Sequence, residues 1–328
     1  MWNSLRTPGS KTALQSAIFL VSFFCIFLRL AGSEEPAVIP SFQPSFAMKI
    51  QIELDQKGYS PGEIDATLGM NTRKAISTFQ KFHNMKPTGK ADPLTLKDLL
   101  DDSPPVKYYT IDDDDVSGPF TPRIPRDLLE QTKLPSLEYT SPMELLSEKF
   151  HVNPALLRKM NPRSKFKKGE NIVVPNVTPL GEITIRRADV RPVTITVSDK
   201  NCDLTVTNKN GDFLMYAPVT LGMKGAPLPI GTWAVDAIED YPYFHYNPKL
   251  MVKPNPKHKK DGYLNPGPNN PVGIAWIDIN VAHMGMHGTS SPSKIGHRQS
   301  NGCIRLTNWD VFRLASIVEP GTTVVFVK

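Results

Sequence analysis

The chain has 328 residues, of which 40% are hydrophobic and 21% are charged, with a net charge of +6 at pH 7. Its length leaves room for two or more domains, and its hydrophobic content is enough to build their cores. The basic excess suits an anionic partner, but it is small and spread along the chain. No zinc-finger or RNA-recognition motif accompanies it, so the composition argues against nucleic-acid binding.

The N-terminus has the pattern of an export signal. Arg6 and Lys11 precede a charge-free, mainly apolar run over residues 17–28, which is shorter than the roughly 20 residues that a spanning helix needs. Small residues follow at positions 31–33, where a signal peptidase could cut. We expect residues 1–33 to be a signal peptide, and an uncleaved membrane anchor is the alternative.

Residues 46–100 predict a small three-helix domain. Apolar residues at Ala75, Ile76, Phe79 and Phe82 recur at the spacing of an amphipathic helix, which Asn71 or Thr72 could cap. With its own apolar periodicity and caps, the block is expected to fold alone.

This block resembles the peptidoglycan-binding domain 1 family over nearly its full length. The resemblance implies binding to peptidoglycan, and a three-helix bundle without a ligand is the alternative. The matching residues are Gly58, Tyr59, Pro61, Gly62, Ile64, Asp65, Gly69, Thr72, Ala75, Ile76, Phe79, Gln80, Thr88, Gly89, Thr95 and Leu96.

Residues 101–138 have the composition of a linker. The aspartates from Asp112 to Asp115 lack the loop glycine and the terminal glutamate of an EF-hand, so a solvated acidic stretch is expected rather than a calcium site. Residues 139–178 then show two short helical periods and the strand-like "NIVVP". They resemble a LysM domain, a glycan-binding βααβ unit, but Ser141-Pro142 replaces the usual glycine-aspartate, which weakens the expectation of sugar binding.

Residues 182–328 read mainly as strands, with one helix at "NWDVFRLASIV". Asn210-Gly211 between two β-branched runs predicts a hairpin. A long proline-rich stretch, residues 241–271, has the character of an active-site lid, and its lysines 253, 257, 259 and 260 could meet carboxylates of a substrate. The fold class expected for the whole chain is multidomain α+β, with a mainly β C-terminal domain.

Cys303 is a candidate nucleophile. A thiol with a pKa of about 8.5 is mostly protonated at neutral pH, so it needs a base, and histidine is the natural one. His287 stands where the strand-like "INVAHMGM" ends, within reach of a chain that loops back to Cys303. A disulfide between Cys202 and Cys303 would consume this thiol, and we expect the two cysteines not to be paired.

The segment "MHGTSSPSKIGHRQSNGCIRLTNWD" resembles the catalytic motif of the L,D-transpeptidases of the YkuD type. Upstream stretches such as "PIGTWAV" and "NPGPNNPVGIAWI" match further landmarks of that domain. The resemblance implies that Cys303 is the nucleophile, that His287 takes its proton, and that the backbone carbonyl of Gly288 orients the imidazole.

The same motif supplies supporting residues. The resemblance implies that N–H groups near Gly302 and Cys303 form the oxyanion hole, with Ser300 beside them, and that Arg305 serves either the structure or the substrate. Asn301 stands where the family usually has histidine, so a second acid or cation is not expected there. We interpret the two remaining nearby histidines, at positions 283 and 297, as non-catalytic.

The resemblance implies an exported enzyme of the periplasm or cell wall. Its partners would be the stem peptides and glycan of peptidoglycan, and no metal or organic cofactor is implied. The cysteine would attack a tetrapeptide stem and release D-alanine, and the acyl group would pass to another stem, to a lysine of a wall-anchored lipoprotein or to a free D-amino acid. The alternatives are an L,D-carboxypeptidase and an inactive wall-binding scaffold.

Overall fold

The computed structural model describes residues 42–182, 192–223, 225–252 and 255–328. The expected signal peptide, residues 1–33, lies outside the described residues. Among the helices of the described part, none is long and apolar enough to cross a bilayer.

The N-terminal block consists of three helices, and its first helix is buried on several sides. They are α1 (Phe46–Gln56), α2 (Met70–Phe82) and α3 (Pro93–Leu99). In α1, Ile50 packs with α2 and α3, whereas Met48 and Ile52 pack into the core of the next block. The expected cap of α2 was wrong by a few residues, because Gly69 occupies the N-cap position and Thr72 is buried, accepting a hydrogen bond from Gln51.

The middle block begins with a strand that lies before residues 139–178, and four short helices separate it in the chain from a second strand. Its elements are β1 (Val106–Thr110), α4 (Asp114–Ser117), α5 (Leu128–Gln131), α6 (Pro142–Lys149), α7 (Pro154–Met160) and β2 (Asn171–Pro175). Strand β1 pairs antiparallel with β2. Residues 101–138 are therefore more than a linker: "VKYYT" is β-branched and aromatic, and the neighbouring prolines and aspartates obscured that pattern.

The acidic run is solvated only in part, because Asp112 to Asp114 are exposed whereas Asp115 is not. Asp115 is buried, and its carboxylate accepts hydrogen bonds from Lys149 Nζ at 2.8 Å and from the Tyr109 hydroxyl at 2.6 Å. It thus fixes α4 against α6.

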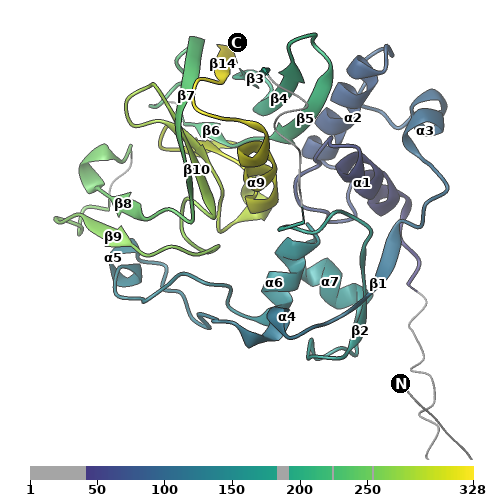
Figure 1. Ribbon diagram of the computed structural model, residues 1–328, viewed down its shortest axis with the longest axis horizontal. Helices are drawn as coiled ribbons and strands as arrows, with labels where there is room; N and C mark the ends of the chain where they lie inside the picture. The colour runs from purple at the N-terminus through teal and green to yellow at the C-terminus, as the bar shows by residue number, and fades with distance from the viewer. Residues whose placement is uncertain (1–41, 183–191, 224, 253–254) are drawn as a thin grey trace, which may run out of the picture. The chain divides into compact units, whose positions relative to one another are not determined.

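The C-terminal part is built on a sheet that, within the described residues, has eight strands in the order β13-β11-β10-β7-β14-β3-β4-β5. The helix α9 (Asn308–Ile317) packs on β10 and β11 (Figure 1). The hairpin predicted at Asn210-Gly211 joins β4 to β5 and is confirmed. The sheet strands are β3 (Val193–Ser198), β4 (Asp203–Asn208), β5 (Phe213–Pro218), β7 (Gly231–Asp240), β10 (Ala275–Ile279), β11 (Gly285–His287), β13 (Ile304–Arg305) and β14 (Thr323–Val327).

The helical block covers the edge strand β5. The backbone N–H of Ser60 donates to the carbonyl of Tyr216 at 3.0 Å, and the Tyr59 ring stacks on Phe213 with centroids 3.9 Å apart. An exposed edge strand is open to pairing with other chains. The N-terminal block therefore protects this edge of the sheet.

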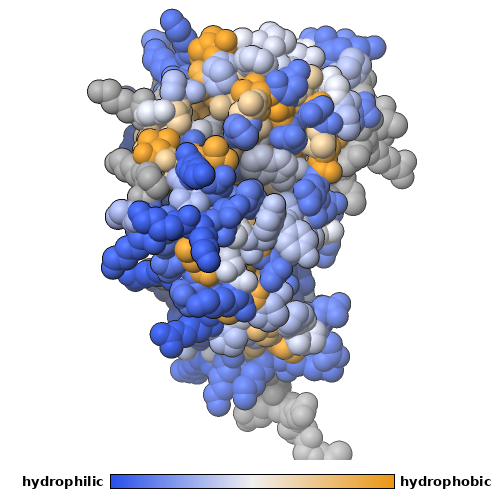
Figure 2. Space-filling view, turned by 90° about the vertical axis from the view of Figure 1, so that its left-hand side faces the viewer, coloured by the Kyte–Doolittle hydropathy of each residue, from blue (hydrophilic) through white to orange (hydrophobic). Residues whose placement is uncertain are grey.

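The lid, residues 241–271, contains a short hairpin of β8 (Phe244–Tyr246) and β9 (Gly262–Leu264), with the 3₁₀ turn η1 (Pro248–Leu250) between them. It packs on residues 124–138, which we call the strap, around the buried side chains of Leu137, Tyr246 and Leu264. Figure 2 views the molecule from this side, where hydrophobic patches alternate with polar side chains.

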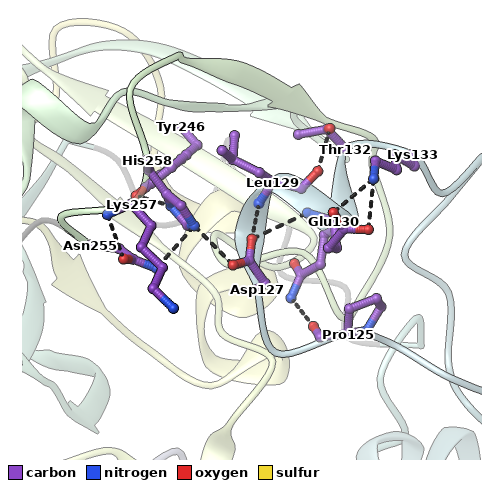
Figure 3. Close-up of polar contacts among 11 residues, drawn as sticks. Pro125, Asp127, Leu129, Glu130, Thr132, Lys133, Tyr246, Asn255, Lys257 and His258 are labelled. Carbon is purple, nitrogen blue, oxygen red and sulfur yellow. Dashed lines mark hydrogen bonds and ion pairs between the residues drawn. The ribbon is translucent and has the colours of Figure 1, made fainter.

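Polar contacts also join the strap to the lid (Figure 3). In the lid, His258 Nδ1 accepts a hydrogen bond from the Tyr246 hydroxyl at 2.8 Å. The Nε2 of His258 lies 2.9 Å from the Asp127 carboxylate of the strap. The strap thus holds the lid in place by both apolar and polar contacts.

Three further short elements lie in the described residues of the C-terminal part. Strand β6 (Leu221–Gly222) pairs with β12 (Arg298–Ser300), and the 3₁₀ turn η2 (Pro292–Lys294) lies between His287 and β12 in the chain.

Candidate active site

Two neighbouring strands bring His287 and Cys303 into one cavity. Strands β11 and β13 run parallel, with Met286 opposite Ile304 and His287 opposite Arg305. Cys303 is the residue immediately before β13, so it lies beside the strand that ends at His287. Both side chains line a cavity of about 480 Å³. The sheet register therefore explains how the two residues meet.

The buried imidazole of His287 is held on two sides. Its Nδ1 lies 2.7 Å from the carbonyl oxygen of Gly288, and its ring stacks on Trp276 with centroids 5.4 Å apart. Because a carbonyl oxygen only accepts, we assign the proton to Nδ1, and Nε2 keeps its lone pair. Burial, aided by the nearby Arg305 cation, lowers the pKa of His287 to about 3. The imidazole is neutral near pH 7 and able to accept a proton.

The thiol of Cys303 is also neutral at rest. Burial raises its pKa above the ordinary value, and a backbone hydrogen bond from Gly285 and the charge of Arg305 offset this only in part. Its Sγ lies 3.8 Å from the carbonyl oxygen of His283. The site thus holds a thiol and a neutral imidazole, and the proton has to leave the sulfur as the sulfur attacks.

Ser300 shapes the turn that presents Cys303. Its buried hydroxyl donates to the carbonyl of Cys303 at 2.6 Å and accepts from the N–H of Gly302 at 3.2 Å. Gly302 has a φ of 132°, in a region that favours glycine. The Gly302 N–H, which the resemblance places near an oxyanion, donates to Ser300 in this structure.

Asn301 links the catalytic turn to the lid. Its Oδ1 accepts the backbone N–H of Val252 at 3.1 Å, and its Nδ2 lies 3.2 Å from Met251 Sδ. The residue that departs from the usual family pattern is therefore a lid contact, a role that an asparagine amide can fill without a charge.

Arg305 is a cation close to both reacting groups. Its charge contributes to the low pKa of His287 and partly offsets the raised pKa of Cys303. Its Nε is buried and has no hydrogen-bond partner among the residues that the structure describes. Among the described residues no carboxylate forms an ion pair with Arg305.

Asn308 connects the His287 loop to the middle block. Its Oδ1 accepts the N–H of Thr289 at 3.2 Å, and its Nδ2 donates to Glu148 of α6 at 2.7 Å. The carboxyl of Glu148 is also reached by the Tyr139 hydroxyl at 3.3 Å. A side chain of the middle block thus supports the segment that follows His287.

Some residues of the cavity were missed by the sequence analysis. His283, which we interpreted as non-catalytic, lines the cavity, and its backbone carbonyl accepts a hydrogen bond from the Cys303 thiol. His297 is exposed and does not line this cavity. Trp276 stands in the stretch "NPGPNNPVGIAWI" that the resemblance covers, but its contact with His287 follows only from the pairing of β10 with β11.

The lid contributes apolar and aromatic side chains to the cavity rather than lysines. The lysines expected to meet carboxylates do not line it at positions 257, 259 and 260, and position 253 lies outside the described residues. In the described part of the chain, no group of His, Cys, Asp and Glu side chains gathers as a metal site would require. The lid residues that line the cavity are Pro242, Tyr243, Phe244, His245, Leu250, Met251 and Pro271.

Comparison with known families agrees with this architecture. Residues 192–326 match the YkuD family, described as "L,D-transpeptidase catalytic domain", and residues 45–99 match the PG_binding_1 family, described as "Putative peptidoglycan binding domain". The chain therefore carries an L,D-transpeptidase catalytic domain preceded by a peptidoglycan-binding domain.

Individual relatives match part of the chain. It is 51% identical over 59 residues to "Putative L,D-transpeptidase YkuD" of Bacillus licheniformis, which covers 18% of this chain and 36% of that protein. It is 25% identical over 199 residues to "Probable L,D-transpeptidase YbiS" of Escherichia coli, covering 57% and 60% respectively. The chain thus spans less than two thirds of these relatives.

Among solved structures, the chain matches "L,D-transpeptidase from Mycobacterium smegmatis" with a TM-score of 0.34 and 19% identity, over 42% of this chain and 58% of that one.

Proposed function

We propose that this chain is a peptidoglycan L,D-transpeptidase with Cys303 as its nucleophile and His287 as the base. The observation that carries the proposal is the pair of groups in one cavity, with His287 Nδ1 bound to the Gly288 carbonyl so that Nε2 is left to take a proton. The family of residues 192–326 supplies the reaction class.

In the first step, the sulfur of Cys303 attacks the carbonyl carbon between the third and fourth residues of a tetrapeptide stem. The thiol proton passes to His287 Nε2, a C–S bond forms, and the carbonyl oxygen becomes an oxyanion. Collapse of the tetrahedral intermediate breaks the C–N bond, and the leaving D-alanine takes the proton from His287. A neutral imidazole suits this sequence, because it starts able to accept the proton.

In the second step, an amine attacks the thioester, a C–N bond forms, and the C–S bond breaks. The amine proton returns through His287 to the sulfur. The Cys303 N–H is our candidate for the oxyanion, in place of Gly302, and a single such donor typically contributes roughly 3 kcal/mol. Water as the attacking group would give a carboxypeptidase instead.

The proposed place of action is the cell wall, after export. The peptidoglycan-binding domain supports a wall partner. Two expectations stay predictions from the resemblance: that the middle block binds glycan, and that a lipoprotein lysine serves as an acceptor.

The test is acylation of purified protein by a disaccharide-tetrapeptide and by a carbapenem, followed by mass spectrometry and by D-alanine release. Cys303→Ala and His287→Ala should both abolish release, because the two residues act as one unit. Asn301→Ala should lower the rate about 10- to 100-fold through its contact with the lid.

Asn301→His, which restores the usual family residue, is the matched control and should leave substantial activity. An inactive scaffold would give neither an adduct nor D-alanine. If His287→Ala stays active while Asn301→Ala is dead, the base has been assigned to the wrong residue.

A further inference from the structure

The hairpin of the lid has one covered face and one open face. Successive side chains of a strand point to opposite faces of the ladder. Phe244, Tyr246 and Leu264 pack on the strap side, and Figure 3 shows Tyr246 reaching His258 there. His245 and Tyr263 stand opposite each other in the ladder, and both are exposed. The strap therefore covers one face of the hairpin and leaves the other to solvent.

The open face is aromatic, although a solvent-facing strand position usually carries a polar side chain. Tyr263 and Tyr243 are 63% and 61% exposed, the largest values among the exposed large hydrophobic side chains that the structure describes. The Tyr263 ring lies nearly flat against the imidazole of His245, with centroids 4.5 Å apart and an angle of 12° between the planes. The Asp261 carboxylate lies 2.9 Å from His245 Nε2 and fixes that imidazole. We call Tyr243, His245 and Tyr263 the lid platform.

The lid platform adjoins the cavity that holds Cys303. Tyr243 and His245 line this cavity, and so does Leu250, which is 48% exposed. Exposed rings gathered at the edge of a cavity mark an interaction site rather than scattered surface residues. A ligand that enters the cavity and extends beyond it on the lid side meets the platform.

The chemistry of the platform suits a sugar. A pyranose ring carries C–H bonds on its faces and hydroxyls around its edge. Its C–H bonds pack on aromatic rings, because the face of an aromatic ring is negative and the hydrogens are slightly positive. Its hydroxyls need polar partners, and the half-exposed carboxylate of Asp261 and the tyrosine hydroxyls supply them. Flat rings bordered by a carboxylate meet both needs.

The length of a stem brings its sugar to this place. In the proposed reaction the attacked carbonyl belongs to the third residue of the stem, and the first residue is attached to the glycan. Three extended residues span at most about 11 Å. A stem with its carbonyl at Cys303 therefore has its sugar close to the mouth of the cavity. The peptidoglycan-binding domain of residues 45–99 independently supports a wall partner.

We propose that the lid platform binds the sugar that carries the donor stem, an inference that rests on the proposed function. The rings of Tyr243 and Tyr263 stack on the saccharide while the stem lies in the cavity. Binding at the platform then holds the stem with its third carbonyl at Cys303. The chain should therefore act on stems that are still attached to glycan in preference to free tetrapeptides.

The first experiment compares a disaccharide-tetrapeptide with the free tetrapeptide as donors for the full chain, by the rate of D-alanine release. We expect kcat/KM to be about tenfold higher for the disaccharide form, which is the effect of two aromatic contacts of ordinary strength. Equal values for the two donors, with Cys303 acylated by both, would overturn the inference and leave the proposed function intact.

Variants then assign this preference to the lid platform. Tyr263→Ala should lower the ratio of the two kcat/KM values at least about threefold, whereas Tyr263→Phe should keep most of it because the ring remains. Ile230→Ala is the matched control, because Ile230 is an exposed apolar residue of the catalytic domain that lies outside the lid and does not line the cavity. Equal effects of Tyr263→Ala and Ile230→Ala on the ratio would count against the platform.

Binding gives a readout that needs no chemistry. Saturation-transfer NMR with Cys303→Ala protein and the muramyl disaccharide without a stem should give a signal that weakens when Tyr263→Ala is added. If no donor acylates Cys303 but this weakening is seen, the proposed function fails and the platform stands. Equal signals from the two proteins refute the platform. A dimer that becomes a monomer in Tyr263→Ala also refutes it, because the rings would then contact a second copy of the chain.

Discussion

Replacing Glu148 by glutamine tests whether the middle block stabilises the loop that follows His287. The carboxyl of Glu148 is fully buried and accepts a hydrogen bond from Asn308 Nδ2 at 2.7 Å. Glutamine has nearly the same shape and keeps an oxygen that can accept this bond, but it cannot ionise. The variant therefore removes the titration and preserves the contact.

Burial raises the pKa of Glu148 from its usual 4.5 to about 8. In the unfolded chain the carboxyl ionises near its usual pKa, whereas the folded protein retains the proton until about pH 8. Unfolding between these values releases a proton, so this group's contribution to stability is fully present below about pH 4.5 and is lost as the pH rises to about 8. At about 1.4 kcal/mol per pH unit, the loss reaches at most about 5 kcal/mol.

Urea unfolding followed by tryptophan fluorescence, between about pH 5 and pH 8, measures the effect. The free energy of unfolding should fall with pH more steeply in the wild-type protein than in Glu148→Gln, and the variant should be the more stable of the two at the alkaline end. Glu130→Gln, at an exposed position of the strap, should follow the wild-type slope. Parallel slopes for wild type and Glu148→Gln would refute the reasoning.

Three further outcomes are expected. Gly288→Ala should lower carbapenem acylation at least about tenfold, because its Cβ would lie 2.2 Å from Asn308 Oδ1; normal acylation would show that the loop can move aside. Tyr59→Ala should destabilise the protein by about 3 kcal/mol in thermal unfolding, since it removes the ring stacked on Phe213; a change below about 1 kcal/mol would mean that the edge strand does not depend on it. Asp127→Asn should lower the free energy of unfolding in urea by less than about 1 kcal/mol, because its contact with the lid histidine is partly exposed. A much larger decrease would show that this contact contributes more to stability than we expect.

Much of the catalytic domain followed from local sequence patterns. Asn210-Gly211 identified the hairpin because Asn-Gly is a strong turn signal between two strand-like runs. His287 and Cys303 were found by the motif around them, and the structure places them in one cavity. Each of these patterns spans only a few residues, so it can be recognised in the sequence without knowledge of the fold.

The surroundings of the site could not be predicted in the same way. Gln131 lines a cavity next to the one that holds Cys303, although it lies more than 150 residues earlier in the chain, and nothing in "LLEQ" indicates this. The engagement of the Gly302 N–H by Ser300 is a matter of turn geometry. The placement of β1 was hidden because its pairing partner, β2, lies far along the chain. Such contacts depend on tertiary structure, which leaves no local periodicity.

The side chains of α1 pack into two hydrophobic cores, and this affects whether the wall-binding domain can be transferred to another protein. Ile50 and Leu54 belong to the helical block, but Met48 and Ile52 pack with the middle block, and all four are fully buried. A fragment of residues 46–100 would expose Met48 and Ile52 to water, which weighs against the expectation that it folds alone. Fusion of this fragment to another protein would then carry two exposed apolar side chains with it, so the domain is better moved together with the block on which it rests.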